Sequence, residues 1–258
     1  MKTFVISLEN EVARRHWMRE QLESLRLDYE FFDAIRGSEY FDDSRWYDDA
    51  SARRLEGRSL RPGEVGCALS HAAVYAEIVK RKIPWALILE DDAVLHKALP
   101  AILSAIEHGA GRQGQLISLS RCDAYLPWTK ERLWGEFSIA TPCLVKEGAI
   151  AQSVGYVVSL DAAKAIAKAN VPVKFPADSW GHYRGLVKFK GVVPTLSVVR
   201  QNTSFQSTTL PGGVRPDFVP YSMTALLMHG FLTYTYLGRW CKKIIKRVRT
   251  SKKDMNAR

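Results

Sequence analysis

The strongest constraint on the fold is an apolar run that ends in three consecutive acids. In "WALILEDDA", residues 85–93, four apolar residues are followed directly by Glu90, Asp91 and Asp92. A short apolar run of this kind is typical of a strand that is buried on both faces. The three acids belong either to a ligand site at the carboxyl end of that strand or to an ordinary solvated turn. The rest of the chain has to decide between these two interpretations.

Strand and helix patterns alternate along most of the chain. Strands are predicted at 2–7, 29–35, 85–90, 115–120, 153–159 and 191–199, and helices at about 11–25, 62–81, 100–109 and 160–170. Asn10 is expected to cap the first helix, and Pro62 suits a first helical position. Residues 37–60 lack periodicity, which predicts a long loop with a short helical turn. The alternation indicates an α/β fold, in which a mostly parallel sheet carries helices on both faces.

The position of the acids in this order favours a ligand site. Ligands of open α/β sheets bind outside the carboxyl ends of the strands, and the acids lie at such an end. Carboxylates are preferred ligands of Mg²⁺ and Mn²⁺, often together with substrate phosphates. In extended backbone, Glu90 and Asp92 point to one side and Asp91 to the other. Because clustered acids repel one another without a cation, we expect a divalent metal here.

The net charge of +10 is concentrated near the end of the chain. Nine of the twenty residues from Arg239 to Arg258 are Lys or Arg and one is acidic, so residues 1–238 are close to neutral. A nucleic-acid-binding domain spreads its basic residues over a folded face, so we expect no nucleic-acid partner. The four cysteines have no CxxC spacing, which predicts reduced thiols in a cytosolic protein. We divide the chain into a domain over residues 1–220 and a tail over residues 221–258.

The tail has an amphipathic pattern. Apolar residues recur on one helical stripe from Leu227 onward, and the basic residues fall mainly on another side. This predicts that residues 227–253 bind an anionic membrane surface. The alternative is a helix that packs on the folded body with a solvated basic end. Residues 221–238 contain no charged residue, yet Thr, Tyr, His and Gly make them a poor membrane-spanning helix.

Several motifs, in order along the chain, resemble glycosyltransferase family 25. They are "VISLENEVARR" (5–15), "RPGEVGCALSHAAVYAEIV" (61–79), "WALILEDDA" (85–93), "SVGYVVSLDAAKAIA" (153–167) and "PADSWGHY" (176–183). This family of lipopolysaccharide and lipooligosaccharide glycosyltransferases includes β-galactosyltransferases. The resemblance spans roughly residues 2–210. It implies a GT-A-like, Rossmann-type domain, a DxD-type acidic motif that binds Mn²⁺ (or Mg²⁺) and the donor diphosphate, and inversion at the sugar carbon.

The resemblance assigns donor and metal roles to individual residues. Asp92 is expected to ligate the metal, and Glu90 or Asp91 to assist there or to contact the ribose. Which acid touches the metal stays open, because the first position of the motif is Glu. Further donor contacts are expected near the ends of strands and on the helix that begins at Pro62, from Ser7, Leu8, Asn10, Arg14, Asp33, Ser70, His71, Gln201 and Ser207. Arg14 has the alternative of solvating a helix face, and His71 that of a structural hydrogen bond.

The motif at 176–183 supplies the expected catalytic base, Asp178. An inverting transfer needs a carboxylate that deprotonates the acceptor hydroxyl. The alternative role of Asp178 is to cap a short helix, and Asp123 is a second candidate acid. Trp180 and Tyr183 are expected to stack on an acceptor sugar, and His182 to contact a metal or a phosphate.

These expectations describe an inverting, metal-dependent transferase. It would move a hexose, foremost galactose from UDP-galactose, to a lipid-anchored lipooligosaccharide acceptor. It would be cytoplasmic and peripheral on the inner face of the bacterial inner membrane. The alternative is a catalytically silent component that binds a nucleotide sugar or an acceptor in a membrane-associated glycan assembly complex. A phosphoryl-transfer receiver domain is disfavoured, because the chain is too long for that class and its motif order differs.

Overall fold

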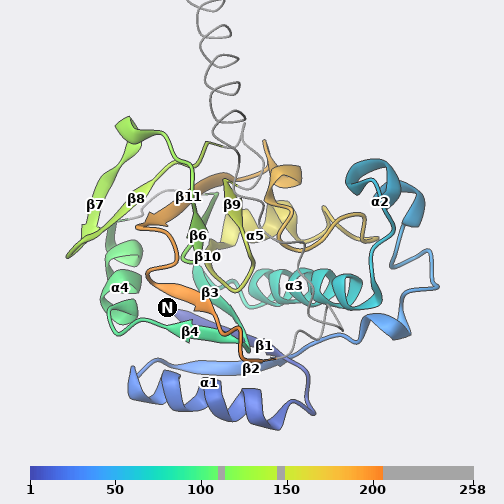
Figure 1. The fold of residues 1–258 in the computed structure, drawn as a ribbon, viewed down its shortest axis with the longest axis horizontal. Coiled ribbons are helices and arrows are strands. Elements are labelled where there is room, and N and C mark those ends of the chain that lie inside the picture. The colour runs from blue at the N-terminus through green and yellow to red at the C-terminus, as the bar shows by residue number, and fades with distance from the viewer. Residues whose placement is uncertain (110–113, 144–148, 206–258) are drawn as a thin grey trace, which may run out of the picture. The chain divides into compact units, whose positions relative to one another are not determined.

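An eight-stranded sheet lies at the centre of the computed structural model, which describes residues 1–109, 114–143 and 149–205 (Figure 1). Its strands lie in the order β2-β1-β3-β10-β5-β11-β8-β7. Their bounds are β1 (Lys2–Ser7), β2 (Tyr29–Asp33), β3 (Trp85–Glu90), β5 (Gln115–Ser118), β7 (Glu131–Trp134), β8 (Phe137–Ala140), β10 (Gly155–Ser159) and β11 (Lys188–Val193). Two smaller sheets pair β4 (Ala93–Leu95) with β12 (Val199–Gln201), and β6 (Arg121–Cys122) with β9 (Ile150–Ala151).

Six of the eight strands run in one direction. Strand β1 is parallel to β2 and β3, and β5 is parallel to β11, whereas β10 and β8 are antiparallel to both of their neighbours. The predicted α/β fold with a mostly parallel sheet is therefore confirmed. The antiparallel direction of β10 was not predicted. It places the amino end of β10 beside the carboxyl end of β3.

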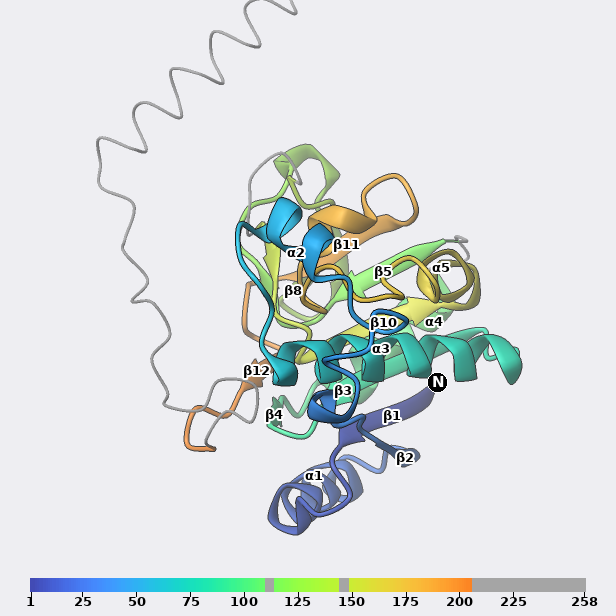
Figure 2. The same cartoon turned by 90° about the vertical axis from the view of Figure 1, so that its right-hand side faces the viewer.

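Helices cover both faces of the sheet (Figure 2). Helices α1 (Val12–Ser24) and α4 (Leu99–Gly109) pack on one face, and α3 (Pro62–Lys80) and α5 (Leu160–Ile166) pack on the other. Residues of β3 alternate between the two cores. Leu87 and Leu89 pack with α1 and α4, whereas Ala86 and Ile88 pack with α3 and α5. This two-sided burial explains why the apolar run of β3 is unbroken.

Residues 37–60 contain more regular structure than the predicted loop. They form η1 (Gly37–Glu39) and the eight-residue helix α2 (Asp49–Glu56). The side chain of Asp48 accepts a hydrogen bond from the Ser51 amide and so caps α2. The backbones of α3 and η1 lie in close contact. A Cβ on Gly37 would lie only 1.7 Å from the carbonyl oxygen of Pro62, so only glycine fits there. This contact fixes the loop after β2 against the first turns of α3.

Three further details differ from the sequence predictions. Asn10 does not cap α1, whose N-cap residue is Glu11 with no side-chain hydrogen bond. The strand predicted at 191–199 is split into β11 and β12, since Pro194 cannot donate to a strand ladder. Residues 121–151 received no predicted element, yet β6, η2 (Pro127–Thr129), β7, β8 and β9 lie there.

The predicted tail over residues 221–258, which includes the residues 227–253 expected to bind a membrane surface, lies outside the described residues. The same is true of Ser207. Within the described ranges, no helix combines the length and the apolar character that crossing a membrane requires.

Candidate functional site

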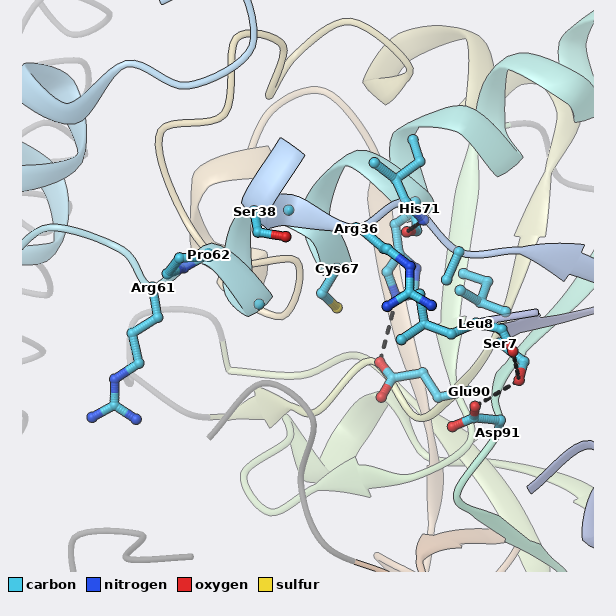
Figure 3. Close-up of a pocket in the computed structure, with 16 residues that line it drawn as sticks. Ser7, Leu8, Arg36, Ser38, Arg61, Pro62, Cys67, His71, Glu90 and Asp91 are labelled. Atoms are coloured by element: carbon cyan, nitrogen blue, oxygen red, sulfur yellow. Dashed lines mark hydrogen bonds and ion pairs between the residues drawn. The ribbon is translucent and has the colours of Figure 1, made fainter. Parts of the chain in front are cut away.

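The carboxyl ends of β1, β2 and β3 open onto a pocket of about 460 Å³. The strand register sets Ser7 beside Asp33 and Ile6 beside Glu90, so the three ends are adjacent. The loop after β2 and the first turns of α3 complete the wall (Figure 3). Among the lining residues are Ser7, Leu8, Arg36, Ser38, Arg61, Pro62, Cys67, His71, Glu90 and Asp91. A second pocket of about 530 Å³ adjoins the first and shares Leu8, Ala34, Ile35 and Arg36 with it.

Asp91 is engaged in an internal ion pair. Its Oδ1 accepts a hydrogen bond from Arg14 Nη1 at 2.8 Å, and its Oδ2 accepts one from Ser7 Oγ at 2.7 Å. Arg14 is only 7% exposed, so it does not solvate a helix face. Burial raises the pKa of Asp91 although the bonds from Ser7 and Arg14 oppose the rise. The pair fixes α1 to the end of β3.

Glu90 points to the other side of β3, toward α3. Its Oε1 accepts a hydrogen bond from Ser153 Oγ at 2.5 Å and lies 3.3 Å from His71 Nε2. Burial alone would raise the pKa of Glu90, but the contacts with His71 and Ser153 outweigh it and hold the pKa below the ordinary value. Glu90 is therefore an ionised carboxylate on the pocket wall.

Asp92 contacts a third element. Its Oδ2 accepts a hydrogen bond from Gln201 Nε2 of β12 at 2.7 Å. Strand β3 ends at Glu90 and a turn follows, so the simple alternation predicted for the three acids is not maintained through Asp92. Burial, followed by the negative charges of Glu90 and Asp91, raises the pKa of Asp92 to about 6. Asp92 is thus ionised at neutral pH only at a cost in free energy.

The environment of Asp92 fits a divalent cation. Its Oδ1 is buried and has no hydrogen-bond partner within the described part of the chain. Buried carboxylate oxygens are ordinarily paired, and two further acids lie directly before this one. A hard cation such as Mn²⁺ or Mg²⁺ takes oxygen ligands of this kind and leaves coordination positions for phosphate.

His71 connects Glu90 to a buried chain of hydroxyl groups. It is 2% exposed. Its Nδ1 lies 2.7 Å from the Tyr156 hydroxyl, which lies 2.6 Å from the Tyr75 hydroxyl. The structural hydrogen bond considered from the sequence is therefore present at Nδ1. The other ring nitrogen faces Glu90, so His71 also belongs to the pocket.

Asp178 approaches the same site from the segment before η3 (Trp180–Tyr183). Asp178 is exposed to solvent, yet desolvation of its carboxyl group by the neighbouring protein, followed by the charge of Glu90, raises the pKa of Asp178. Asp178 does not cap η3, whose N-cap residue is Ser179 with no side-chain hydrogen bond. Burial, followed by the charges of Glu90, Asp178 and Asp92, also raises the pKa of Cys67 well above its ordinary value. Glu90, Asp92 and Asp178 therefore all act on the small region around Cys67.

Comparison with known protein families identifies the family of the chain that forms this site. The profile described as "Glycosyltransferase family 25 (LPS biosynthesis protein)" matches residues 1–180, which include the three acids and the pocket wall. The chain belongs to glycosyltransferase family 25. The family 25 resemblance seen in the sequence motifs is thereby confirmed.

Curated relatives match the family 25 domain over part of their length. A "Glycosyltransferase 25 family member" of Aedes aegypti is 27% identical over 205 residues, which cover 70% of this chain and 32% of the relative. The "Procollagen galactosyltransferase 1-A" of Xenopus laevis is 28% identical over 191 residues, 69% of this chain and 30% of the relative. The human "Inactive glycosyltransferase 25 family member 3" is 33% identical over 104 residues, 35% of this chain and 16% of the relative. The chain spans about a third of the length of the first of these relatives.

The other predicted donor residues of this family 25 chain occupy different positions around the pockets. Ser7, Leu8, Ser70 and His71 line the first pocket, although Ser70 is buried and bonds to backbone, donating to the Gly66 carbonyl and accepting from the Ile35 amide. Leu8, Asn10 and Asp33 line the second. Asp33 is exposed and ion-paired with Arg15.

Trp180 and Tyr183 do not fit the predicted role in sugar stacking. They are 2% and 4% exposed and belong to the core between the sheet and α3. Buried rings in this position pack against the fold and present no free face to a sugar. His182 stacks on Phe175 and lies 3.0 Å from Glu56, so its contacts are also internal. Asp123 pairs with Arg121 and accepts from Thr195.

Four residues at or behind the pocket wall were not among the predicted contacts. Arg36 and Cys67 line the pocket, whereas Ser153 and Tyr156 contact the wall residues Glu90 and His71. Arg36 could have been predicted from the sequence, because it lies in the loop that directly follows β2. It lies on the wall shared by both pockets, and its Nη2 donates to Asn10 Oδ1 at 2.6 Å. Ser153 and Tyr156 could not be predicted in this way, because only the antiparallel direction of β10 brings them to Glu90 and His71.

Proposed function

We propose that this chain is an inverting, metal-dependent hexosyltransferase that uses a UDP-sugar. The observation that carries the proposal is the buried Oδ1 of Asp92, just after β3, for which the described residues provide no hydrogen-bond partner. Asp92 directly follows Glu90 and Asp91, which line the first pocket together with Arg36 and Arg61. Membership of glycosyltransferase family 25 supports the reaction class.

The two adjoining pockets suit a nucleotide sugar. Arg36 lines both pockets, and its guanidinium group would supply a positive charge for the donor diphosphate. The nucleoside would occupy the pocket lined by Asn10 and Asp33, and the sugar the pocket lined by His71 and Glu90. Asp92 would hold Mn²⁺, with Glu90 as the second carboxylate nearby. When bound, the cation would neutralise the charge that develops on the departing diphosphate.

Asp178 is proposed as the catalytic base. Its carboxylate takes the proton of the acceptor hydroxyl as the acceptor oxygen attacks the anomeric carbon. The bond from that carbon to the diphosphate breaks from the opposite side, and UDP leaves with the electron pair. The raised pKa of Asp178 supports this role, since a base works best when its pKa approaches the working pH.

Galactose is the proposed sugar, and a lipooligosaccharide the proposed acceptor. A galactosyltransferase name among the relatives supports the first, and the family description as an LPS biosynthesis protein supports the second. The basic residues within 227–253 support docking on an anionic membrane surface, where a lipid-anchored acceptor is presented. The proposed place is the inner face of the bacterial inner membrane.

The test is transfer from UDP-galactose by Asp178→Asn. We expect a loss of roughly 10²–10⁴-fold in kcat, with donor binding retained, because general base catalysis typically contributes that much. Asp161→Asn is the matched control, since Asp161 lies on α5 and pairs with Lys164. Full activity of Asp178→Asn would refute its role as base.

A catalytically silent binding component is the second candidate, because one human relative is named inactive. Hydrolysis of UDP-galactose with and without Mn²⁺ separates the two. Metal-stimulated release of UDP supports the transferase. Tight donor binding without any UDP release, with or without acceptor, supports the silent component.

A further inference from the structure

Cys67, His71 and Glu90 form a compact cluster on the inner wall of the first pocket (Figure 3). One ligand atom from each of the three residues lies within 4.8 Å of the others. Cys67 and His71 are four positions apart on α3 and therefore share a helix face. Glu90 reaches them from the end of β3. The fold thus brings one sulfur, one nitrogen and one oxygen ligand to the same small volume.

Hydrogen bonds orient the nitrogen and oxygen ligands of this cluster. The Nδ1 of His71 is held by the Tyr156 hydroxyl at 2.7 Å, which leaves Nε2 facing Glu90. Metal-binding imidazoles characteristically donate their other N–H to an oxygen in this way, and the bond fixes both tautomer and ring orientation. On Glu90, both contacts go to Oε1, and Oε2 accepts no hydrogen bond from the described part of the chain. That oxygen is available to a ligand.

The surroundings of the cluster attract a cation. The negative charges of Glu90, Asp178 and Asp92 all act on Cys67. A tetrahedral zinc ion with bonds of about 2.0–2.3 Å holds its ligand atoms roughly 3.3–3.6 Å apart. Side-chain movements of about 1 Å would bring the present cluster to that spacing. The open side of the pocket leaves a fourth position for water.

The ligand set differs in kind from that of Asp92. Thiolate and imidazole ligands suit Zn²⁺ or Co²⁺, whereas carboxylates alone suit Mn²⁺ and Mg²⁺. We propose that Cys67, His71 and Glu90 form a binding site for a thiophilic divalent cation such as Zn²⁺, which shares Glu90 with the proposed oxygen-ligand site at Asp92 but takes its sulfur and nitrogen ligands from α3. Binding forms a bond from Cys67 Sγ to the cation and releases the thiol proton to solvent. The proposal does not depend on transferase activity.

Titration of the full, tag-free chain with Co²⁺ tests the site, because a cobalt–thiolate bond gives an absorption band in the near ultraviolet. We expect one equivalent of Co²⁺ to produce this band and one equivalent of Zn²⁺ to abolish it. Cys67→Ser should lack the band, and His71→Gln should bind at least about tenfold more weakly. Cys143→Ser is the matched control and should behave as the wild type, since Cys143 is a free, half-buried thiol outside the cluster.

Two outcomes would overturn the proposal. One is the absence of a thiolate band in the wild-type chain, a result that needs no variant to fold. The other is a band of equal intensity in Cys67→Ser. Asp92→Asn gives a further check, because it should leave the cobalt band in place while removing Mn²⁺ binding. Loss of Mn²⁺ binding in the wild type as well would contradict the proposed function and leave the thiolate site intact.

Discussion

Replacing Asp92 by Asn is expected to stabilise the metal-free protein. The wild-type carboxylate is 6% exposed, and its Oδ1 has no partner among the described residues. Asn is nearly isosteric and keeps an oxygen for the hydrogen bond from Gln201 Nε2. The substitution therefore removes a buried charge without opening a cavity.

The expected gain in the free energy of unfolding follows from the pKa of Asp92, which is raised from 3.8 to about 6. A raised carboxyl pKa means that the folded protein holds this proton more tightly than the unfolded chain does. The ionised group then opposes folding above pH 6, and its cost disappears as the pH falls toward 3.8. A shift of about two units corresponds to about 3 kcal/mol in the free energy of unfolding. At pH 5 roughly half of that difference remains.

Thermal unfolding in EDTA at pH 8 and pH 5 measures this effect. At about 2–4 °C per kcal/mol for a chain of this size, Asp92→Asn should raise Tm by about 6–12 °C at pH 8. Asp91→Asn is the control and should lower the free energy of unfolding by about 1–3 kcal/mol, because the bond from buried Arg14 to Asp91 loses its charge on the acceptor side. An unchanged or lower Tm for Asp92→Asn at pH 8 would refute the reasoning.

Three further predictions concern the surrounding structure. Gly66→Ala should lower the free energy of unfolding by about 1–3 kcal/mol in urea titrations, because its Cβ would lie 2.5 Å from the Gly37 amide nitrogen, and an unchanged midpoint would contradict that contact. Tyr156→Phe should cost about 1–3 kcal/mol by the same measurement, since His71 Nδ1 loses a buried partner. The Mn²⁺ affinity should fall about tenfold per pH unit below about pH 6, as Asp92 protonates, and calorimetry that finds equal affinity at pH 7.5 and pH 5 would exclude Asp92 as a ligand.

The fold was largely predictable because hydrophobic patterns determine which faces of an element are buried. The unbroken apolar run of β3 indicated a strand between two helical layers, and it lies there. Strand direction is a different matter, because a buried strand has the same pattern in either direction. The antiparallel course of β10 therefore went unpredicted. The short strands between 121 and 151 were missed because elements of two to four residues contain too few positions for a periodic signal.

The site was predictable only where local sequence and local geometry coincide. The acids after β3 and the residues after β1 were identified because strand ends mark ligand sites in this fold class. The prediction for Trp180 and Tyr183 was wrong because the sequence alone does not distinguish an aromatic residue that packs in a core from one that binds a sugar. Ser153 bonds to Glu90 across 63 positions of sequence, a pairing that only the tertiary structure reveals.

The three adjacent acids take their partners from distant parts of the chain, and this sets an order of completion during synthesis. Arg14 precedes its acid by 77 positions and His71 by 19, whereas Gln201 follows Asp92 by 109. At roughly 5–20 residues per second, about 5–20 s separate the synthesis of Asp92 from that of Gln201. A nascent chain therefore carries the acidic triplet for seconds with Ser7, Arg14 and His71 already made and Gln201 still to come. The acid proposed to hold the cation is the last to be fixed, so the donor site is completed only when β12 joins β4.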